Sequence, residues 1–327
     1  MQRRTLLSAL AAAGATTAAP WAFAQSASPW PDQPLRWVVP YPAGGGTDVL
    51  ARTVAEAMRQ TLGQQIIVDN RPGAATNIGG QAVTTSKPDG NTFMSADNAI
   101  LAFNEHLFTK LPFNPEKDFT YVGGISRFPL ALVVHPSFEA KTVKEFLAYA
   151  RANPGKLNYA SPGNGSPHHL AMEMFKNRTN TFLTHIPYRG AAPALQDVMG
   201  GQVPCMFLDL AAGLPVIQSG KVRALAIGSA MRVAALPDVP TLAEAGVPNT
   251  EVYAFQGILA PAGLPAAITA RLNGDLNKAL INPAVVKRMT DFGMEPLPGT
   301  PEQFRAMARA ESKRWGEIIK AAGVKLD

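Results

Sequence analysis

Residues 35–48, LRWVVPYPAGGGTD, contain the pattern that decides the fold. The mostly apolar residues 35–39 predict a buried strand, and Pro40 to Gly46 predict a turn that is first rigid and then flexible. Thr47 and Asp48 are residue types that cap helices, and the amphipathic segment after them predicts a helix that ends near Gly63. A strand that passes through a Gly-rich turn into a helix is the opening unit of an α/β fold.

The same alternation continues along the chain. Strands at 66–68 and 93–96, with a helix from about Asn77 between them, complete a β-α-β-α-β unit of a parallel sheet. A second unit is expected after Gly123-Gly124, with strands at 130–134, 157–160, 182–186 and 206–208 and helices at 143–151, 166–177 and 192–199. A strand at 222–227 returns the chain, and helices are expected at 266–280, 284–292 and 301–322.

These two α/β units predict two domains. We interpret the C-terminal stretch as part of the first unit, so domain 1 is discontinuous (25–127 and 227–327) and encloses domain 2 (128–226). Two such lobes with a cleft between them form a ligand trap.

A second Gly-rich loop has the same design as the first. Residues 161–165 are Ser-Pro-Gly-Asn-Gly, Ser166 is a good N-cap, and Pro167 suits the first helical position. The first amides of a helix lack partners and the helix dipole is positive there, so each loop can bind an anion through its backbone. The alternative is that both are ordinary tight turns. Neither has P-loop or dinucleotide-binding spacing.

The N-terminus predicts an export signal over residues 1–24. Arg3 and Arg4 precede an apolar stretch without charge (6–19), and Ala22-Phe23-Ala24 predicts cleavage before Gln25. A membrane anchor is the alternative, but the stretch is short for a span, which needs roughly 20 apolar residues. The two arginines fit either a twin-arginine or a general secretory signal. Pro, Gly or charge interrupts every later apolar run, so we expect a soluble periplasmic protein without membrane insertion.

Composition and motifs argue against several function classes. Removing the signal removes two arginines and no acids, so the net charge falls from +6 to +4 without a basic run, and nucleic-acid binding is not expected. The single cysteine, Cys205, is interpreted as a buried thiol. His168 and His169 are adjacent and cannot bind one metal ion together. His106, His135 and His185 are scattered and receive no role.

Recognised catalytic motifs are missing from the sequence. Ser166 with His169 is the single candidate for a nucleophile and its base, and the N-cap role of Ser166 argues against it. His169 fits a buried structural histidine or a donor to an anion. Asp209, which follows a strand, fits an N-cap or an acceptor from a ligand hydroxyl or amine.

The sequence resembles the Bug/TctC family, the extracytoplasmic solute receptors of tripartite tricarboxylate transporters. The matching motifs span nearly the whole mature chain, in order: 39–48 (VPYPAGGGTD), 69–74 (DNRPGA), 87–90 (KPDG), 155–161 (GKLNYAS), 169–170 (HL), 187–190 (PYRG), 236–241 (LPDVPT) and 260–263 (APAG). The resemblance implies a two-lobed α/β periplasmic binding protein fold, type II-like, with two crossover segments and the ligand cleft between two βα domains.

The resemblance also implies which residues hold a carboxylate, largely through backbone amides and ordered water. They are Tyr41, Ala43, Gly45, Thr47 and Asp48 in the first loop, Ser161, Gly163, Ser166 and His169 in the second, and Asn98, Tyr188 and Asp209 in secondary roles. It implies no cofactor, no metal and no catalysis.

The expected function is therefore a monomeric periplasmic receptor that passes a small organic carboxylate to membrane permease subunits. Without dense Arg or Lys near the loops, a mono- or dicarboxylate, aromatic acids included, fits better than a tricarboxylate. A sensor that presents its bound state to a signalling partner is an open alternative, and an exported hydrolase is a third hypothesis.

Overall fold

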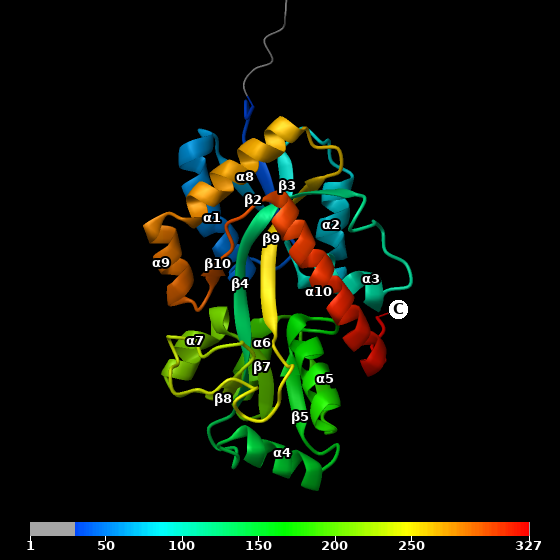
Figure 1. The fold of residues 1–327 in the computed structure, drawn as a ribbon, viewed down its shortest axis with the longest axis vertical. Coiled ribbons are helices and arrows are strands. Elements are labelled where there is room, and N and C mark those ends of the chain that lie inside the picture. Colours follow the sequence, from blue (N-terminus) through cyan, green and yellow to red (C-terminus); the bar gives the residue numbers. More distant parts are fainter. Residues whose placement is uncertain (1–29, 327) are drawn as a thin grey trace, which may run out of the picture. The chain divides into compact units, whose positions relative to one another are not determined.

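The computed structural model describes residues 30–326 as an α/β fold (Figure 1), and the predicted signal at 1–24 lies outside them. The strands are β1 (Leu35–Val39), β2 (Ile66–Asn70), β3 (Thr92–Asp97), β4 (Phe119–Val134), β5 (Asn158–Ser161), β6 (Thr184–Pro187), β7 (Cys205–Asp209), β8 (Arg223–Ile227), β9 (Tyr253–Pro261) and β10 (Glu295–Pro296). The helices are α1 (Gly46–Leu62), α2 (Asn77–Thr84), α3 (Asn104–Leu107), α4 (Val143–Ala152), α5 (Pro167–Thr179), α6 (Ala191–Met199), α7 (Leu210–Gln218), α8 (Ala266–Leu280), α9 (Pro283–Asp291) and α10 (Pro301–Ala322), with a short 3-10 helix η1 (Ala74–Thr76) and a short π-helix η2 (Ala99–Phe103).

One continuous path of paired strands joins most of the sheet, in the order β2-β1-β3-β9-β4-β7-β5-β6. The pairs of β1 with β2 and β3, and of β5 with β6 and β7, are parallel. β9 and β4 are antiparallel to each other and to their neighbours, and they run side by side through the middle of Figure 1. β4 pairs with β9 from Phe119 to Pro129, with β7 from Leu130 to Val134 and with β8 from Ala131 to Val134, so this strand connects the two sets of parallel strands.

Most of the elements expected from the sequence are present, but the bounds of β4 were wrong and both β9 and α7 were missed. β4 begins at Phe119, so Gly123 and Gly124, which were expected to precede the strand at 130–134, lie inside one longer strand. Both glycines allow close packing, because a Cβ at Gly123 would lie 2.8 Å from Asn273 Nδ2 and one at Gly124 would lie 3.0 Å from Leu297 Cβ. β9 was not expected, and its antiparallel pairing makes the sheet mixed instead of parallel. α7 was also missed, since Gly213 and Pro215 interrupt its helical pattern.

Apolar side chains are buried on both sides of the central strands β4 and β9. Trp37 of β1 packs on Phe93 of β3 with ring centroids 5.2 Å apart. A second cluster joins Ala131 of β4, Val198 of α6 and Leu236 of the segment 228–252. Full burial of one large apolar side chain contributes about 1.5–3 kcal/mol, so these clusters hold the strand ends in fixed positions.

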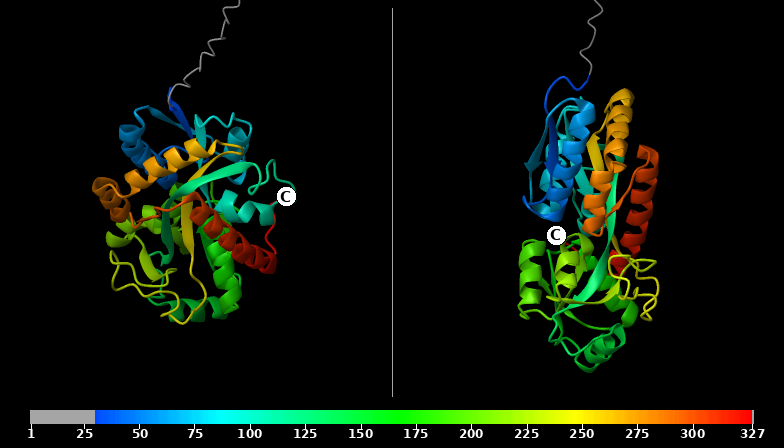
Figure 2. Two further views of the ribbon diagram at one scale, coloured as in Figure 1. Left: turned by 45° about the horizontal axis from the view of Figure 1, so that its top comes forward. Right: turned by 90° about the vertical axis from the view of Figure 1, so that its left-hand side faces the viewer.

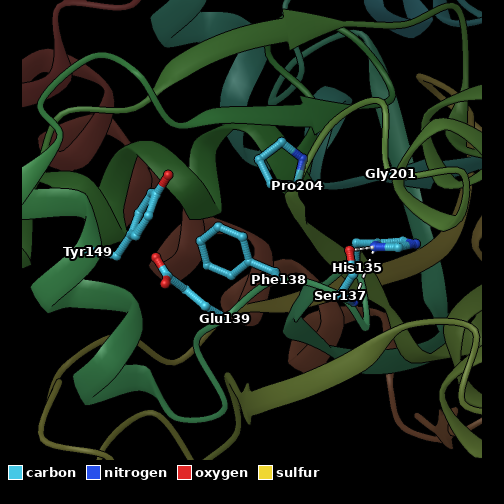
Figure 3. Close-up of a pocket in the computed structure, with 7 residues that line it drawn as sticks. All are labelled: His135, Ser137, Phe138, Glu139, Tyr149, Gly201 and Pro204. Carbon is cyan, nitrogen blue, oxygen red and sulfur yellow. Dashed lines mark hydrogen bonds between the residues drawn. The ribbon is translucent and has the colours of Figure 1, made fainter.

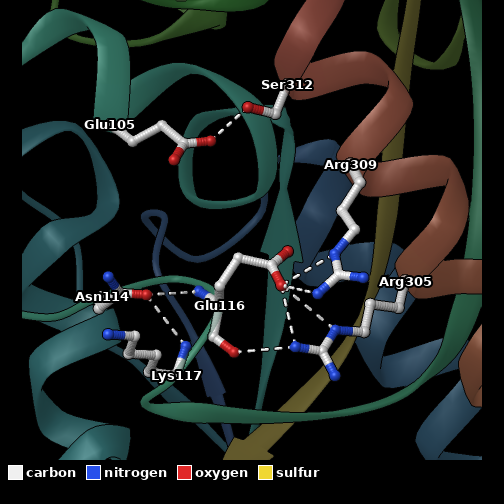
Figure 4. Close-up of polar contacts among 7 residues, drawn as sticks. All are labelled: Glu105, Asn114, Glu116, Lys117, Arg305, Arg309 and Ser312. Carbon is white, nitrogen blue, oxygen red and sulfur yellow. Dashed lines mark hydrogen bonds and ion pairs between the residues drawn. The ribbon is translucent and has the colours of Figure 1, made fainter.

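The C-terminal helix α10 is fixed by charge as well as by packing. In Figure 4, Arg305 and Arg309 point from α10 toward one carboxylate, that of Glu116, with Nη2–Oε2 distances of 2.9 and 2.5 Å. The Arg309 hydrogen bond lowers the pKa of Glu116, burial opposes this, and Arg305 lowers it further. Phe304 of the same helix lies against Gly257 of β9. Figure 2 shows α10 in red beside the strands that it covers.

Among residues 30–326, no helix is long and apolar enough to cross a membrane.

Candidate functional site

The first Gly-rich loop is shaped by Asp48, which is buried at the start of α1. Its carboxylate accepts hydrogen bonds from Gly44 N at 2.9 Å, Arg52 Nε at 3.0 Å and Asn70 Nδ2 at 3.0 Å. Burial alone would raise the pKa of Asp48, but the hydrogen bonds from Arg52, Gly44 and Asn70 outweigh it and lower that pKa. The side chain of Asp48 thus holds the loop through three donors, and its predicted contact with a ligand stays a prediction.

Tyr41 forms a hydrogen bond with the end of β3. Its hydroxyl donates to Asp97, and its carbonyl accepts from Asn70 Nδ2 at 2.9 Å. Burial and then the Asp97 charge raise the pKa of Tyr41 well above its usual value. Burial also raises the pKa of Asp97, against the hydrogen bond from Tyr41 and those from backbone amides. The loop is therefore fixed at its first residue as well as at its last.

Thr47 is fixed by a residue far away in the sequence. Gln256 of β9 donates from Nε2 to Thr47 Oγ1 at 2.8 Å, and Gln256 is buried. The register places Gln256 opposite Asp97 of β3 and opposite Ser126 of β4. Directly opposite residues in antiparallel pairs point to the same face, so these three form a polar row across the sheet beneath the loop.

The N-terminus of α1 has no side-chain cap. Its N-cap is Gly45, in an extended conformation (φ −77°, ψ 168°), without a side chain to accept from the first amides. The residues from Ala43 to Gly46 are exposed. The first helical amides have no partner inside the helix, and the helix dipole favours negative charge there. This end of α1 therefore presents unpaired donors to solvent.

The second Gly-rich loop is folded around Ser161, which ends β5. Ser161 Oγ accepts from Gly163 N at 3.1 Å and lies 2.6 Å from His185 Nε2 on β6. Gly163 has φ +145°, a conformation that favours glycine. His185 received no role from the sequence, because nothing in its neighbourhood marks it.

His169 holds the other end of this loop. Its Nδ1 accepts from Gly165 N at 3.0 Å, so the neutral ring carries its hydrogen on Nε2. Its ring stacks on His185 with centroids 4.0 Å apart and planes 6° apart. Burial, with Lys176 nearby, lowers the pKa of His169 to about 4. Burial, and then repulsion from His169 when it is protonated, lowers the pKa of His185 to about 4.

Ser166 caps α5, as the sequence indicated. Its Oγ accepts from the backbone amide of His169 at 3.3 Å. Because His169 Nδ1 is bonded to Gly165, the serine and the imidazole do not form a nucleophile–base pair here. The geometry gives no support to the hydrolase hypothesis.

Asp209 connects two helix starts. It caps α7 by accepting from Ala212 N at 2.8 Å, and its other oxygen lies 3.0 Å from His168 Nε2 at the start of α5. Burial opposes ionisation, but the hydrogen bond and the charge of His168 lower the pKa of Asp209. A Cβ on Gly46 of α1 would lie 3.9 Å from Ala211 Cβ of α7. Asp209 thus connects the starts of α7 and α5, and the start of α1 lies beside the start of α7.

Two of the secondary predictions have side chains bonded elsewhere. Asn98 donates to Tyr253 O at 3.1 Å and accepts from Phe255 N at 2.8 Å, so it fixes the start of β9. Tyr188 donates to Asp197 at 2.6 Å, and burial raises its pKa to about 12. Their roles in ligand binding stay predictions, as do those of the other residues in the predicted site.

A separate pocket lies just after the C-terminal end of β4. Figure 3 shows its lining, which includes His135, Phe138, Glu139 and Tyr149, and its volume is about 330 Å³. Glu139 places a carboxylate in it, and His135 Nδ1 is bonded to Ser137 at 2.7 Å. An anion would be repelled there, so we place the candidate site at the helix starts.

Within residues 30–326, no group of three His, Cys, Asp or Glu could hold a metal ion.

The fold and the linked helix starts are those of an α/β solute-binding protein. The family model described as "Tripartite tricarboxylate transporter family receptor" (TctC) matches residues 50–324, so the chain belongs to this receptor family. Protein BugT of Bordetella pertussis is 36% identical over 302 residues, which cover 92% of this chain and 93% of that protein. These matches confirm the resemblance seen in the sequence, and the family consists of solute receptors and not of enzymes.

Two solved structures are similar over nearly their whole length. An R. palustris protein with adipate has a TM-score of 0.86 and 35% identity, covering 90% of this chain and 99% of that one. MatC from Rhodopseudomonas palustris with bound malate has a TM-score of 0.81 and 33% identity, covering 88% and 99%. The predicted fold class is confirmed.

Proposed function

We propose that this receptor captures a small organic carboxylate at the start of α1. The observation that carries the proposal is the uncapped N-terminus at Gly45 and Gly46, where backbone amides have no side-chain acceptor. Asp48, Tyr41 and Thr47 each have a partner that fixes the loop around these amides. A rigid set of donors with a positive dipole stabilises a carboxylate without a neighbouring cation.

The ligand class is a mono- or dicarboxylate, aromatic acids included. The similar proteins with adipate and with malate both hold dicarboxylates. The predicted loops contain no Arg or Lys, and the Arg52 side chain beside the first loop is already paired with Asp48. A third carboxylate would bring negative charge without a partner, which is costly at a partly buried site.

Two lobes would close on the ligand. β4 changes partners between Pro129 and Leu130, which supports a crossover close to the predicted boundary at 127/128. Leu236 packs with Val198 in one cluster, so we place the return crossover near Val252, after the predicted 226/227. The second loop, from Ser161 to His169, would then close over the carboxylate held by α1.

We further propose that the protein works in the periplasm and delivers its ligand to a membrane permease. The receptor family supports this role, and residues 1–24 have the composition of an export signal. Uptake of labelled carboxylate by cells that lack this chain, compared with cells that express it, would test delivery.

A thermal-shift panel of mono-, di-, tri- and aromatic carboxylates tests binding. A ligand at a hundredfold excess over Kd stabilises the folded state by about 2.7 kcal/mol, which raises Tm measurably. We expect at least one mono- or dicarboxylate to do so. If no acid in the panel shifts Tm and the purified protein releases no acid in a mass spectrum, the proposal is wrong.

A further inference from the structure

We infer that Gln256 is a positioning residue for ligand binding, which acts by setting the direction of the Thr47 hydroxyl. The inference deepens the proposed function and rests on it. Gln256 lies in β9 and donates to Thr47 Oγ1 at 2.8 Å, across 209 positions of sequence. No motif of the sequence pointed to it.

The direction follows from the hydrogen bond. Thr47 Oγ1 accepts from Gln256 Nε2, so its own hydrogen must point elsewhere. In the same helix, Thr53 and Thr61 donate to the carbonyls of Val49 and Met58. Thr47 stands in the first turn, where no helical carbonyl lies four residues earlier. Among residues 30–326, the Thr47 hydroxyl accepts from Gln256 and has no acceptor for its own hydrogen. That hydrogen can therefore donate to a ligand at the start of α1.

The sheet beneath holds Gln256 in this position. Its neighbour in the polar row, Asp97, accepts from Tyr41, so β3 and β9 each support one residue of the same loop. Gln256 is buried and its Oε1 has no partner among the described residues, nor has Ser126 Oγ on the opposite strand. Within residues 30–326, the Gln256 side chain therefore makes its hydrogen bond to Thr47. A substitution of Gln256 should act on the loop through Thr47.

The consequence is selectivity for an ionised acid. The amides at the start of α1 are donors, and a directed Thr47 hydroxyl adds another. A carboxylate accepts from all of them, whereas an amide nitrogen presents hydrogens to the same donors.

A double-mutant cycle tests the inference by calorimetry with adipate and with malate. The proteins are wild type, Thr47→Val, Gln256→Met and the double variant. We expect each single change to weaken binding about tenfold, the effect of losing one hydrogen bond to a charged group. The double variant should bind as weakly as Thr47→Val alone, because Gln256 acts through Thr47.

Two controls separate positioning from folding. Thr47→Ser keeps the hydroxyl and should keep most of the affinity, and Ser126→Ala changes the same row without touching Thr47 and should bind like wild type. Losses that multiply in the double variant, or an unaffected Gln256→Met, would overturn the inference while carboxylate binding stands. If the wild type binds neither acid, the proposed function fails for these acids and the inference fails with it.

Discussion

Asn70 Nδ2 donates both to Asp48 Oδ1 at 3.0 Å and to Tyr41 O at 2.9 Å, so one amide at the end of β2 ties together both ends of the first Gly-rich loop. Asp48 in turn accepts from Gly44 inside the loop. The conformation that exposes the α1 amides therefore depends on the buried Asp48 carboxylate, which accepts from three protein donors.

Asp48→Asn should lower both stability and affinity. An asparagine has one acceptor oxygen for the three donors and adds an amide where acceptors are needed, so the expected loss in unfolding free energy is about 1–3 kcal/mol. Urea unfolding and calorimetry measure the two effects. Asp69→Asn, in the partly exposed contact with Arg36, is the matched control and should cost less. A loss of affinity with unchanged stability would instead assign Asp48 to direct ligand contact.

Gly46→Pro should weaken ligand binding with little effect on folding. Proline suits the first helical position, and the extended Gly45 is compatible with a following proline. The variant lacks the Gly46 N–H, so we expect about a tenfold or greater loss of carboxylate affinity. Gly46→Ala keeps the N–H and places its Cβ at an ordinary 3.9 Å from Ala211, so it should bind normally. Equal affinities for the two variants would mean that this amide does not contact the ligand.

Acid should destabilise the protein through the stacked histidines. The pKa values of His169 and His185 are about 4 in the folded protein, below the ordinary 6.5. Between these values the unfolded chain binds more protons, so the free energy of unfolding falls as pH falls from about 6.5 to about 4. Chemical unfolding at several pH values measures the slope. His185→Gln, whose amide can still reach Ser161, should flatten it; an unchanged slope would show that His185 does not contribute.

Asp209→Ala should destabilise the connection between α5 and α7. It removes the α7 cap, worth about 0.5–2 kcal/mol, and leaves His168 Nε2 buried without its partner, for about 1–3 kcal/mol more. Asp209→Asn keeps an acceptor for Ala212 and should lose less. Thermal or urea unfolding of both variants measures the loss in unfolding free energy. Equal losses in the two variants would argue against the capping contribution.

The sequence was sufficient to predict the local strand–turn–helix units of this fold, but not how the strands pair in the sheet. A strand, a Gly-rich turn and a helix leave signals within about fifteen neighbouring residues, as in 35–48. β9 leaves an apolar run without a period that distinguishes strand from helix, and its partners lie more than 100 positions away.

The candidate site divides in the same way. The loops were visible because glycine, proline and capping residues mark them. The supporting side chains were not, because Gln256, Asp97 and His185 reach the loops only through long-range strand pairing. Asp48 and Asn98, to which the sequence assigned ligand contacts, also make hydrogen bonds within the protein, and their ligand contacts stay predictions.

The central claim is that donors at the start of α1 select an ionised carboxylate. Calorimetry of the wild-type protein with adipate, malate and the diamides of both acids tests it most directly. We predict that at least one of the two acids binds and that its diamide, which keeps the carbon chain but loses the charge, binds at least a hundredfold more weakly. Equal binding of an acid and its diamide, or no binding of either acid, would contradict the claim.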